Sequence, residues 1–377
     1  MTRLSRITAI AFAVAIGLSG CAGLPGPSEP AVPGASITES AAPAAAARVD
    51  PFASVPNAAV QDRLLALDPD HLTDSDVREV LAGGPAPRII LLHGGVFPAY
   101  LLMKSFGIFL TRMGYPESAI RDPDNDDWSY SPYDDNAEIA GIVAWAYERS
   151  GLRPMLIGHS LGGIQTVRTL QDLAGDFGSP RRVFDPVSRR FEERTTITDP
   201  YTGRPRPVVG LSVSYASATA AGGAGFLLAK QWPMVDRLQN IPDTVDEFTG
   251  FSLDVDLIAW NFPGDSEQYR ATGTARVRNV VLPDTYSHMF VPLTASLPQD
   301  PAVRAWINAW TPDGHEDPST LPAQAQRHVL WAADVWYSVK RHWCLEAQHL
   351  VRAWRARNHE GTPDSGKAPT PAVPRAG

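Results

Sequence analysis

Short apolar runs alternate with longer amphipathic stretches through the middle of the chain. Residues 88–92 end in consecutive apolar side chains before a His-Gly-Gly sequence, which is typical of a buried strand, whereas residues 99–113 carry apolar side chains at helical spacing. The same criteria predict helices at 72–81, 137–150 and 164–173 and strands at 118–121, 153–157, 208–215, 256–262 and 277–282. This alternation predicts an α/β fold with a mostly parallel, doubly wound sheet and helices on both faces.

Two stretches interrupt this alternation, and we interpret them as insertions into a main domain at residues 56–322. The first, at about 181–207, contains the turn sequence 199–203 and indicates a hairpin. The second, at 216–250, begins with small residues and continues with large apolar ones such as Phe226 and Trp232. Its two interpretations are a lid or cap over a substrate pocket and a surface excursion with a small core of its own.

The segment 323–358 is predicted to form a C-terminal amphipathic helix. Val329, Trp336, Trp343 and Leu350 follow one another at seven-residue steps and therefore share a helical face. Docking of this stripe on the core is the simpler interpretation, while the basic residues towards the end of the helix also suit an anionic membrane surface or a partner. The tail at 359–377 is interpreted as disordered, because it has little apolar periodicity.

The amino terminus has the layout of an export signal. Arg3 and Arg6 precede an apolar stretch at 7–18 that is too short to span a bilayer, and residues 18–21 read Leu-Ser-Gly-Cys. This arrangement resembles a bacterial lipoprotein signal, and the resemblance implies a signal peptide at 1–20 and lipid attachment to Cys21. An ordinary secretory signal with an incidental cysteine is the alternative.

A lipid-anchored chain of this kind is expected to sit on the bacterial cell envelope without crossing a membrane. Ala22 stands where the inner-membrane retention signal of lipoproteins has aspartate, so the resemblance favours the outer membrane. Residues 21–55 are rich in Ala, Pro, Gly and Ser and are interpreted as a solvated tether. Cys344 is the only other cysteine, so no intramolecular disulfide is expected if Cys21 is lipidated.

The overall charge excludes one class of partner. The chain has 33 Lys and Arg against 41 Asp and Glu, a formal net charge of −8, which argues against binding to nucleic acid. The acidic run at 122–127 has alternate carboxylates but lacks the glycine and the terminal glutamate of a calcium loop, and we interpret it as a solvated turn. No metal and no cofactor are expected.

The strongest candidate for chemistry is the sequence Gly158-His159-Ser160-Leu161-Gly162-Gly163. It follows the predicted strand 153–157 and precedes the predicted helix 164–173, which is the context of a strained turn that exposes a nucleophilic serine. Gly158 and Gly162 suit such a turn because its backbone is pinched between strand and helix. The alternative is a loop that happens to contain a serine.

Together with His93-Gly94-Gly95 and the later Asp265 and His288, this hexapeptide resembles the α/β-hydrolase superfamily, its lipases and esterases above all. The resemblance implies a triad in the order serine, acid, histidine, with His288 as the base. Asp265 is the preferred acid because it follows the predicted strand 256–262, and Asp284 is its competitor. Asp256 precedes that strand and is therefore expected at the wrong end of the sheet.

The resemblance also assigns an oxyanion hole to the backbone N–H groups of Leu161 and Gly95. His93 is expected to brace the oxyanion loop, and His159 to pack in the elbow. The implied activity is cleavage of acyl esters or lipids through an acyl-enzyme intermediate. Two alternatives remain, an envelope acyltransferase that uses the same intermediate and a non-catalytic lipoprotein that has kept the scaffold for binding.

Overall fold

The computed structural model describes residues 50–178, 180–261, 268–314 and 316–360. The predicted signal peptide, the predicted lipidation site Cys21, most of the predicted tether and the tail beyond residue 360 lie outside the described residues. So does Asp265, the preferred acid. Within the described part, no helix is both long enough and apolar enough to cross a bilayer.

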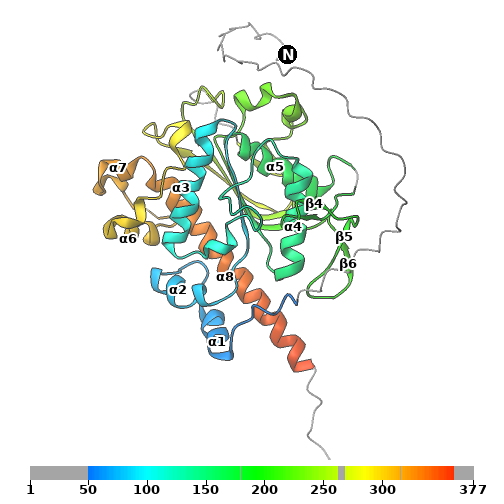
Figure 1. Cartoon of the computed structure of the whole chain (residues 1–377). Helices are drawn as coiled ribbons and strands as arrows, with labels where there is room; N and C mark the ends of the chain where they lie inside the picture. The colour runs from blue at the N-terminus through cyan, green and yellow to red at the C-terminus, as the bar shows by residue number, and fades with distance from the viewer. Residues whose placement is uncertain (1–49, 179, 262–267, 315, 361–377) are drawn as a thin grey trace, which may run out of the picture. The chain divides into compact units, whose positions relative to one another are not determined.

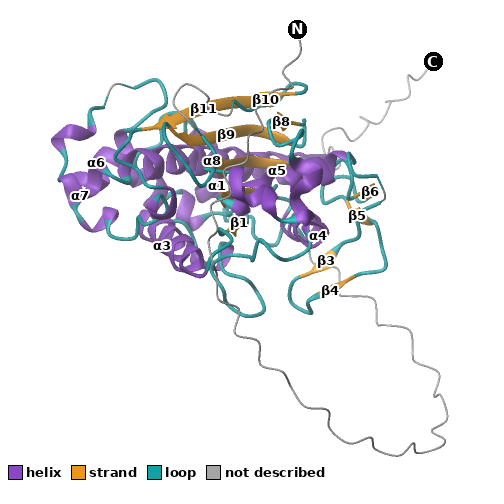
Figure 2. Ribbon diagram, turned by 90° about the horizontal axis from the view of Figure 1, so that it is seen from above, coloured by secondary structure: helices purple, strands orange, loops and turns teal. Residues whose placement is uncertain are grey.

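The centre of the described chain is a five-stranded, wholly parallel sheet. Its strands β1 (Ile89–Leu92), β2 (Met155–His159), β7 (Val213–Thr219), β9 (Val245–Leu253) and β11 (Arg276–Leu282) lie side by side in that order. Figure 2 shows β9 and β11 together, with the short parallel pair β8 (Asn240–Ile241) and β10 (Arg270–Ala271) beside them. Because all five strands are parallel, their carboxyl ends meet at one edge of the sheet, where ligands bind in open α/β folds.

Helices cover both faces of the sheet, as the sequence predicts. On one face, α3 (Phe97–Met113), α6 (Pro301–Ala309) and α8 (Val329–Glu360) share a buried apolar cluster with the strands (Figure 1). On the other face, α4 (Asn136–Ser150) and α5 (Leu161–Ala174) form a second cluster. The protein therefore has a mixed α/β fold with its core in two layers, one on each side of the sheet.

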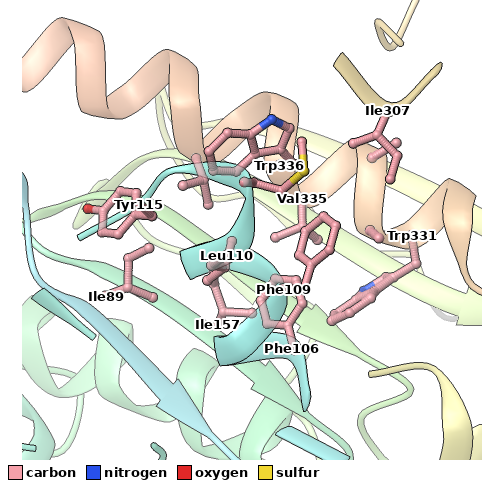
Figure 3. Close-up of a cluster of buried hydrophobic side chains, with 14 of the residues drawn as sticks. Ile89, Phe106, Phe109, Leu110, Tyr115, Ile157, Ile307, Trp331, Val335 and Trp336 are labelled. Atoms are coloured by element: carbon pink, nitrogen blue, oxygen red, sulfur yellow. The ribbon is translucent and has the colours of Figure 1, made fainter. Parts of the chain in front are cut away.

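The first cluster joins the last helix to the first strands. Figure 3 shows side chains of α3 and α8 meeting over the sheet residues Ile89 and Ile157. Each residue of the predicted stripe, Val329, Trp336, Trp343 and Leu350, is fully buried. The stripe on α8 is therefore part of the core and is not available to a membrane surface.

The remaining elements flank this framework. They are α1 (Ala58–Ala66), α2 (Asp74–Glu79), α7 (Ala323–Gln326), the hairpin pairs β3 (Phe184–Asp185) with β4 (Arg190–Phe191) and β5 (Thr196–Thr198) with β6 (Pro205–Pro207), and short 3-10 helices. Thr73 caps α2 in a reciprocal capping box with Asp76. The β5–β6 hairpin turns at Asp199, whose carboxylate accepts the backbone N–H groups of Tyr201 and Thr202.

Two strand predictions are wrong. The 118–121 region holds the 3-10 helix η2 (Glu117–Ala119), and residues 256–261 form a loop. The strand of this region is β9 (Val245–Leu253), which begins within the stretch 216–250 that was interpreted as a lid or surface excursion. β9 has an unusual sequence for a central strand because it contains Glu247 and Gly250. A Cβ at Gly250 would clash with the ring of Tyr269, so the glycine is a packing requirement.

Glu247 is buried at 3% exposure and is neutralised by partners from β11 and α8. Its carboxylate lies 3.3 Å from Arg341 Nη1, 3.4 Å from His342 Nε2 and 3.7 Å from Arg278 Nε. Burial raises the pKa of Glu247, but the hydrogen bond and charge of His342 and the charges of Arg278 and Arg341 outweigh it and lower the pKa to about 2. This cluster fixes β9, and hence the loop that follows it, to the last helix.

Replacing Glu247 by glutamine tests this cluster. Because the folded-state pKa lies below the ordinary 4.5, the carboxylate contributes stability that is present above pH 4.5 and is lost as the pH falls towards 2. Glu247→Gln is expected to lower the free energy of unfolding by about 3 kcal/mol at pH 7, measured by urea unfolding. The deficit relative to the wild type should shrink between pH 4.5 and 3. A pH-independent deficit, or an equal one in the exposed control Glu193→Gln, would contradict the assignment.

Candidate active site

Ser160 lies in a sharp turn between β2 and α5. Its backbone has a φ of 56°, which residues other than glycine rarely adopt. A Cβ at Gly158 would clash with the carbonyl oxygen of Gly162 and with Thr166, and a Cβ at Gly162 would clash with the carbonyl oxygens of Leu92 and His93. The two glycines thus allow the close approach of strand and helix that holds the serine at the carboxyl edge of the sheet.

His288 comes to Ser160 from a point far along the chain. It begins the 3-10 helix η5 (His288–Phe290), which follows β11, and its Nε2 lies 2.9 Å from Ser160 Oγ. The imidazole is buried while Ser160 is partly exposed. Two residues earlier, the hydroxyl of Tyr286 accepts the backbone N–H of Leu330 at 2.9 Å, so the first turn of α8 holds the histidine loop. The predicted pair of serine and histidine is thus within hydrogen-bond distance.

The carboxylate beside His288 is Asp256, which the sequence analysis placed at the wrong end of the sheet. That placement is wrong because the strand before Asp256 is β9, which ends at Leu253, so Asp256 follows the strand and lies at the carboxyl edge. Asp256 Oδ2 lies 2.6 Å from His288 Nδ1. Asp265 lies outside the described residues, and Asp284 is exposed.

A tight loop holds the Asp256 carboxylate. Its Oδ1 accepts the backbone N–H groups of Ile258 and Ala259, both at 3.0 Å, and its backbone pairs with that of Asn261 in both directions. Burial raises the pKa of Asp256, but the hydrogen bonds from His288 and from the two backbone N–H groups outweigh burial. The net pKa therefore lies below its usual range. The group is therefore ionised at neutral pH and suited to orient an imidazole.

His159, expected only to pack in the elbow, has a more specific contact. Its Nε2 lies 2.7 Å from the backbone carbonyl oxygen of His288. Because a carbonyl only accepts hydrogen bonds, this nitrogen carries the proton. Burial, followed by the charge of His288, lowers the pKa of His159 to about 3, so the ring is neutral at ordinary pH. The residue before the serine thereby fixes the backbone of the histidine.

The His-Gly-Gly loop lies beside the serine. A Cβ at Gly94 would contact Ser160 Cβ at 3.2 Å, and a Cβ at Gly95 would contact a side-chain carbon of Leu161 at 3.0 Å. Leu161 is the first residue of α5, where backbone N–H groups have no partner within the helix. The carbonyl oxygen of Gly95 accepts the Tyr133 hydroxyl at 2.5 Å, which fixes the orientation of this peptide. The two predicted oxyanion donors therefore belong to neighbouring segments next to Ser160.

His93 does not share a contact with the triad. Its ring packs edge-on against Tyr100, with 5.7 Å between ring centroids, and its backbone N–H donates to the Tyr130 carbonyl at 3.3 Å. Burial lowers its pKa to about 4, against an opposing charge from Asp127. A neutral, packed ring fits the expected bracing of the oxyanion loop.

The irregular part of the predicted lid consists of η3 (Gly223–Leu227) and η4 (Ala229–Met234), which lie beside the site. The backbone N–H of Ala224 donates to the carbonyl of Ile258 in the Asp256 loop at 2.8 Å. Gly225 packs against Ile164 and Leu161 of α5, and Lys230 Nζ donates to the carbonyl of Tyr133 at 3.0 Å. This segment therefore contacts the Asp256 loop, the first turn of α5 and the segment that carries Tyr133.

Neither a protein-family model nor a curated protein matches the sequence.

We expect Asp256, and not Asp265 or Asp284, to set the reactivity of Ser160. Asp256→Asn removes the charge that stabilises a protonated imidazole and should lower the rate of Ser160 modification by a fluorophosphonate by roughly a thousandfold. Asp284→Asn and Asp265→Asn serve as matched variants and should react within about threefold of the wild type. Unchanged labelling of Asp256→Asn, with loss in Asp265→Asn, would transfer the role to Asp265.

The contact of His159 with the His288 backbone gives a second prediction. His159→Phe keeps a ring but removes the donor, and should lower the same labelling rate about tenfold because the His288 carbonyl loses its buried partner. His159→Gln keeps an N–H donor and should recover most of the rate. If both variants label equally and differ only in thermal stability, His159 has a packing role alone.

Proposed function

We propose that this protein is a serine hydrolase of the α/β-hydrolase type that cleaves carboxylic esters through an acyl-enzyme. The observation that supports this most is the connected chain from Ser160 Oγ to His288 Nε2, at 2.9 Å, and from His288 Nδ1 to Asp256, at 2.6 Å. Nucleophile, base and orienting carboxylate come from loops after three different strands. This hydrogen-bonded order of nucleophile, base and carboxylate is that of a catalytic triad.

In the first step, Ser160 Oγ attacks the ester carbonyl carbon while His288 Nε2 takes the hydroxyl proton. Asp256 holds the ring with its Nδ1 proton directed at the carboxylate and stabilises the imidazolium that forms. The proton on Nε2 then passes to the leaving alkoxide, which departs as the alcohol. An acyl group remains on Ser160.

In the second step, His288 removes a proton from water as the water oxygen attacks the acyl carbon. The bond to Ser160 Oγ then breaks, His288 returns the proton to that oxygen, and the carboxylic acid leaves. Both tetrahedral intermediates carry an oxyanion. The backbone N–H groups of Leu161 and Gly95 are the proposed donors to it, and loss of one such donor typically costs about 3 kcal/mol of transition-state stabilisation. The Tyr133 hydroxyl supports the loop that carries Gly95 by donating a hydrogen bond to the Gly95 carbonyl.

The proposed place of action is the surface of a bacterial envelope membrane, outer rather than inner. This part of the proposal rests on the resemblance of residues 1–21 to a lipoprotein signal, with Cys21 as the anchor. A substrate at that surface would be an acyl ester or a lipid.

Ser160→Ala is the decisive variant for the proposed function. The wild type should hydrolyse a short-chain aryl ester, such as p-nitrophenyl butyrate, and the variant should lose at least a thousandfold in kcat/KM because the nucleophile is absent. Products are analysed with and without an added alcohol. If most of the product is the ester of the added alcohol, the protein is an acyltransferase and not a hydrolase. If the well-folded wild type shows neither turnover nor a fluorophosphonate adduct, the non-catalytic alternative is favoured.

A further inference from the structure

The exposed apolar side chains of this protein gather at one edge of the sheet. Among the described residues, every large hydrophobic side chain that is exposed, except Val187 and Val281, lies in a loop or first helical turns at the carboxyl edge. We call this set the apolar rim: Val96, Phe97, Leu101, Tyr133, Leu227, Leu228, Trp232, Val235, Val255, Leu257, Ile258, Trp260, Phe290 and Leu293.

The topology explains why residues so far apart in sequence share one surface. They follow β1, β7, β9 and β11, and the parallel strands bring those chain segments to the same edge. Contacts already described connect them, since η3 bonds to the Asp256 loop and η4 to Tyr133. The rim therefore shares the carboxyl edge of the sheet with Ser160, which follows β2, the strand between β1 and β7.

The rim side chains are strongly exposed and have few charges among them. Phe97 is 82% exposed, Leu257 72%, Leu227 71% and Trp232 64%. Within the segments 96–101, 131–133, 221–235, 255–261 and 286–293, the only charged side chains besides His288 are Lys230 and Asp256, and charged residues such as Asp134, Asp236 and Asp254 stand at their borders. Lys230 bonds to backbone carbonyls and Asp256 to His288, so neither is available to attract a polar partner. Exposed apolar patches of this kind mark surfaces that are covered in use.

The position of the rim limits what covers it. A protein docked on a surface that shares this edge with Ser160 would close the route to the nucleophile, whereas a lipid surface would cover the same side chains and supply the ester at once. Residues 22–49, between the proposed anchor and the first described residue, reach at most roughly 95 Å at full extension, which is ample for the domain to turn this edge towards the membrane.

We propose that the apolar rim docks on the hydrocarbon of a lipid surface and that the substrates are acyl esters presented in that surface. This inference rests on the proposed function, because it names the substrate class of the same serine. The large rim side chains enter the acyl region, and the ester reaches Ser160 without crossing bulk water.

The test compares an ester in a membrane with an ester in solution. All proteins are the full chain with Cys21→Ser, so that no attached lipid contributes. The probes are a fluorogenic long-chain acyl ester in phosphatidylcholine vesicles and p-nitrophenyl butyrate in solution. In the triple variant Phe97→Ser, Trp232→Ser, Leu257→Ser, the ratio of vesicle rate to solution rate should fall at least tenfold. The matched control Val187→Ser, Val281→Ser should keep the wild-type ratio.

Vesicle flotation with Ser160→Ala protein separates the two proposals. If flotation depends on the rim while neither the protein with an intact Ser160 nor its rim variant hydrolyses any ester, the hydrolase proposal fails and lipid docking stands. Active enzyme with an unchanged ratio in the triple variant, or without rim-dependent flotation, overturns the docking proposal. A dimer in sedimentation that Trp232→Ser converts to monomer also overturns it, because a second copy then covers the rim.

Discussion

The hydrogen bond between Asp256 and His288 is the interaction on which the rest of the candidate site depends. A buried carboxylate is unfavourable unless it is paired and bonded, and here the imidazole and two backbone N–H groups of the same loop meet that need. The loop begins three residues after β9, and β9 is held to β11 and α8 through Glu247. The position of one aspartate is thus traceable to the packing of the whole sheet.

The sequence predicted those parts of the fold whose signals are local. The elbow at Ser160 has its glycines and flanking strand and helix within a few residues, and the stripe on α8 is equally local. The parallel sheet with helices on both faces followed from their alternation. Ser160 and His288 were brought together as expected, because both follow strands of that sheet.

The acid was missed because the features that define β9 are not local. Glu247 and Gly250 look unsuited to a central strand until Arg278, Arg341 and the ring of Tyr269 are seen beside them. The apolar run after Asp256 was read as a strand for the converse reason, since apolar residues normally indicate burial. Leu257 and Trp260 are instead exposed on a loop, and a short apolar run does not by itself distinguish a buried strand from an exposed loop.

The candidate site depends on contacts with α8, which is made late in synthesis. The start of α8 bonds to Tyr286 beside the histidine loop, and Trp331 donates its indole N–H to Thr219, whose carbonyl in turn accepts the N–H of Ser160. During synthesis or export, therefore, Ser160 and the histidine loop lack these contacts until α8 has been made. A chain that stops short of α8 holds both residues without the contacts that fix their positions, so the geometry of the candidate site is completed only when this helix docks.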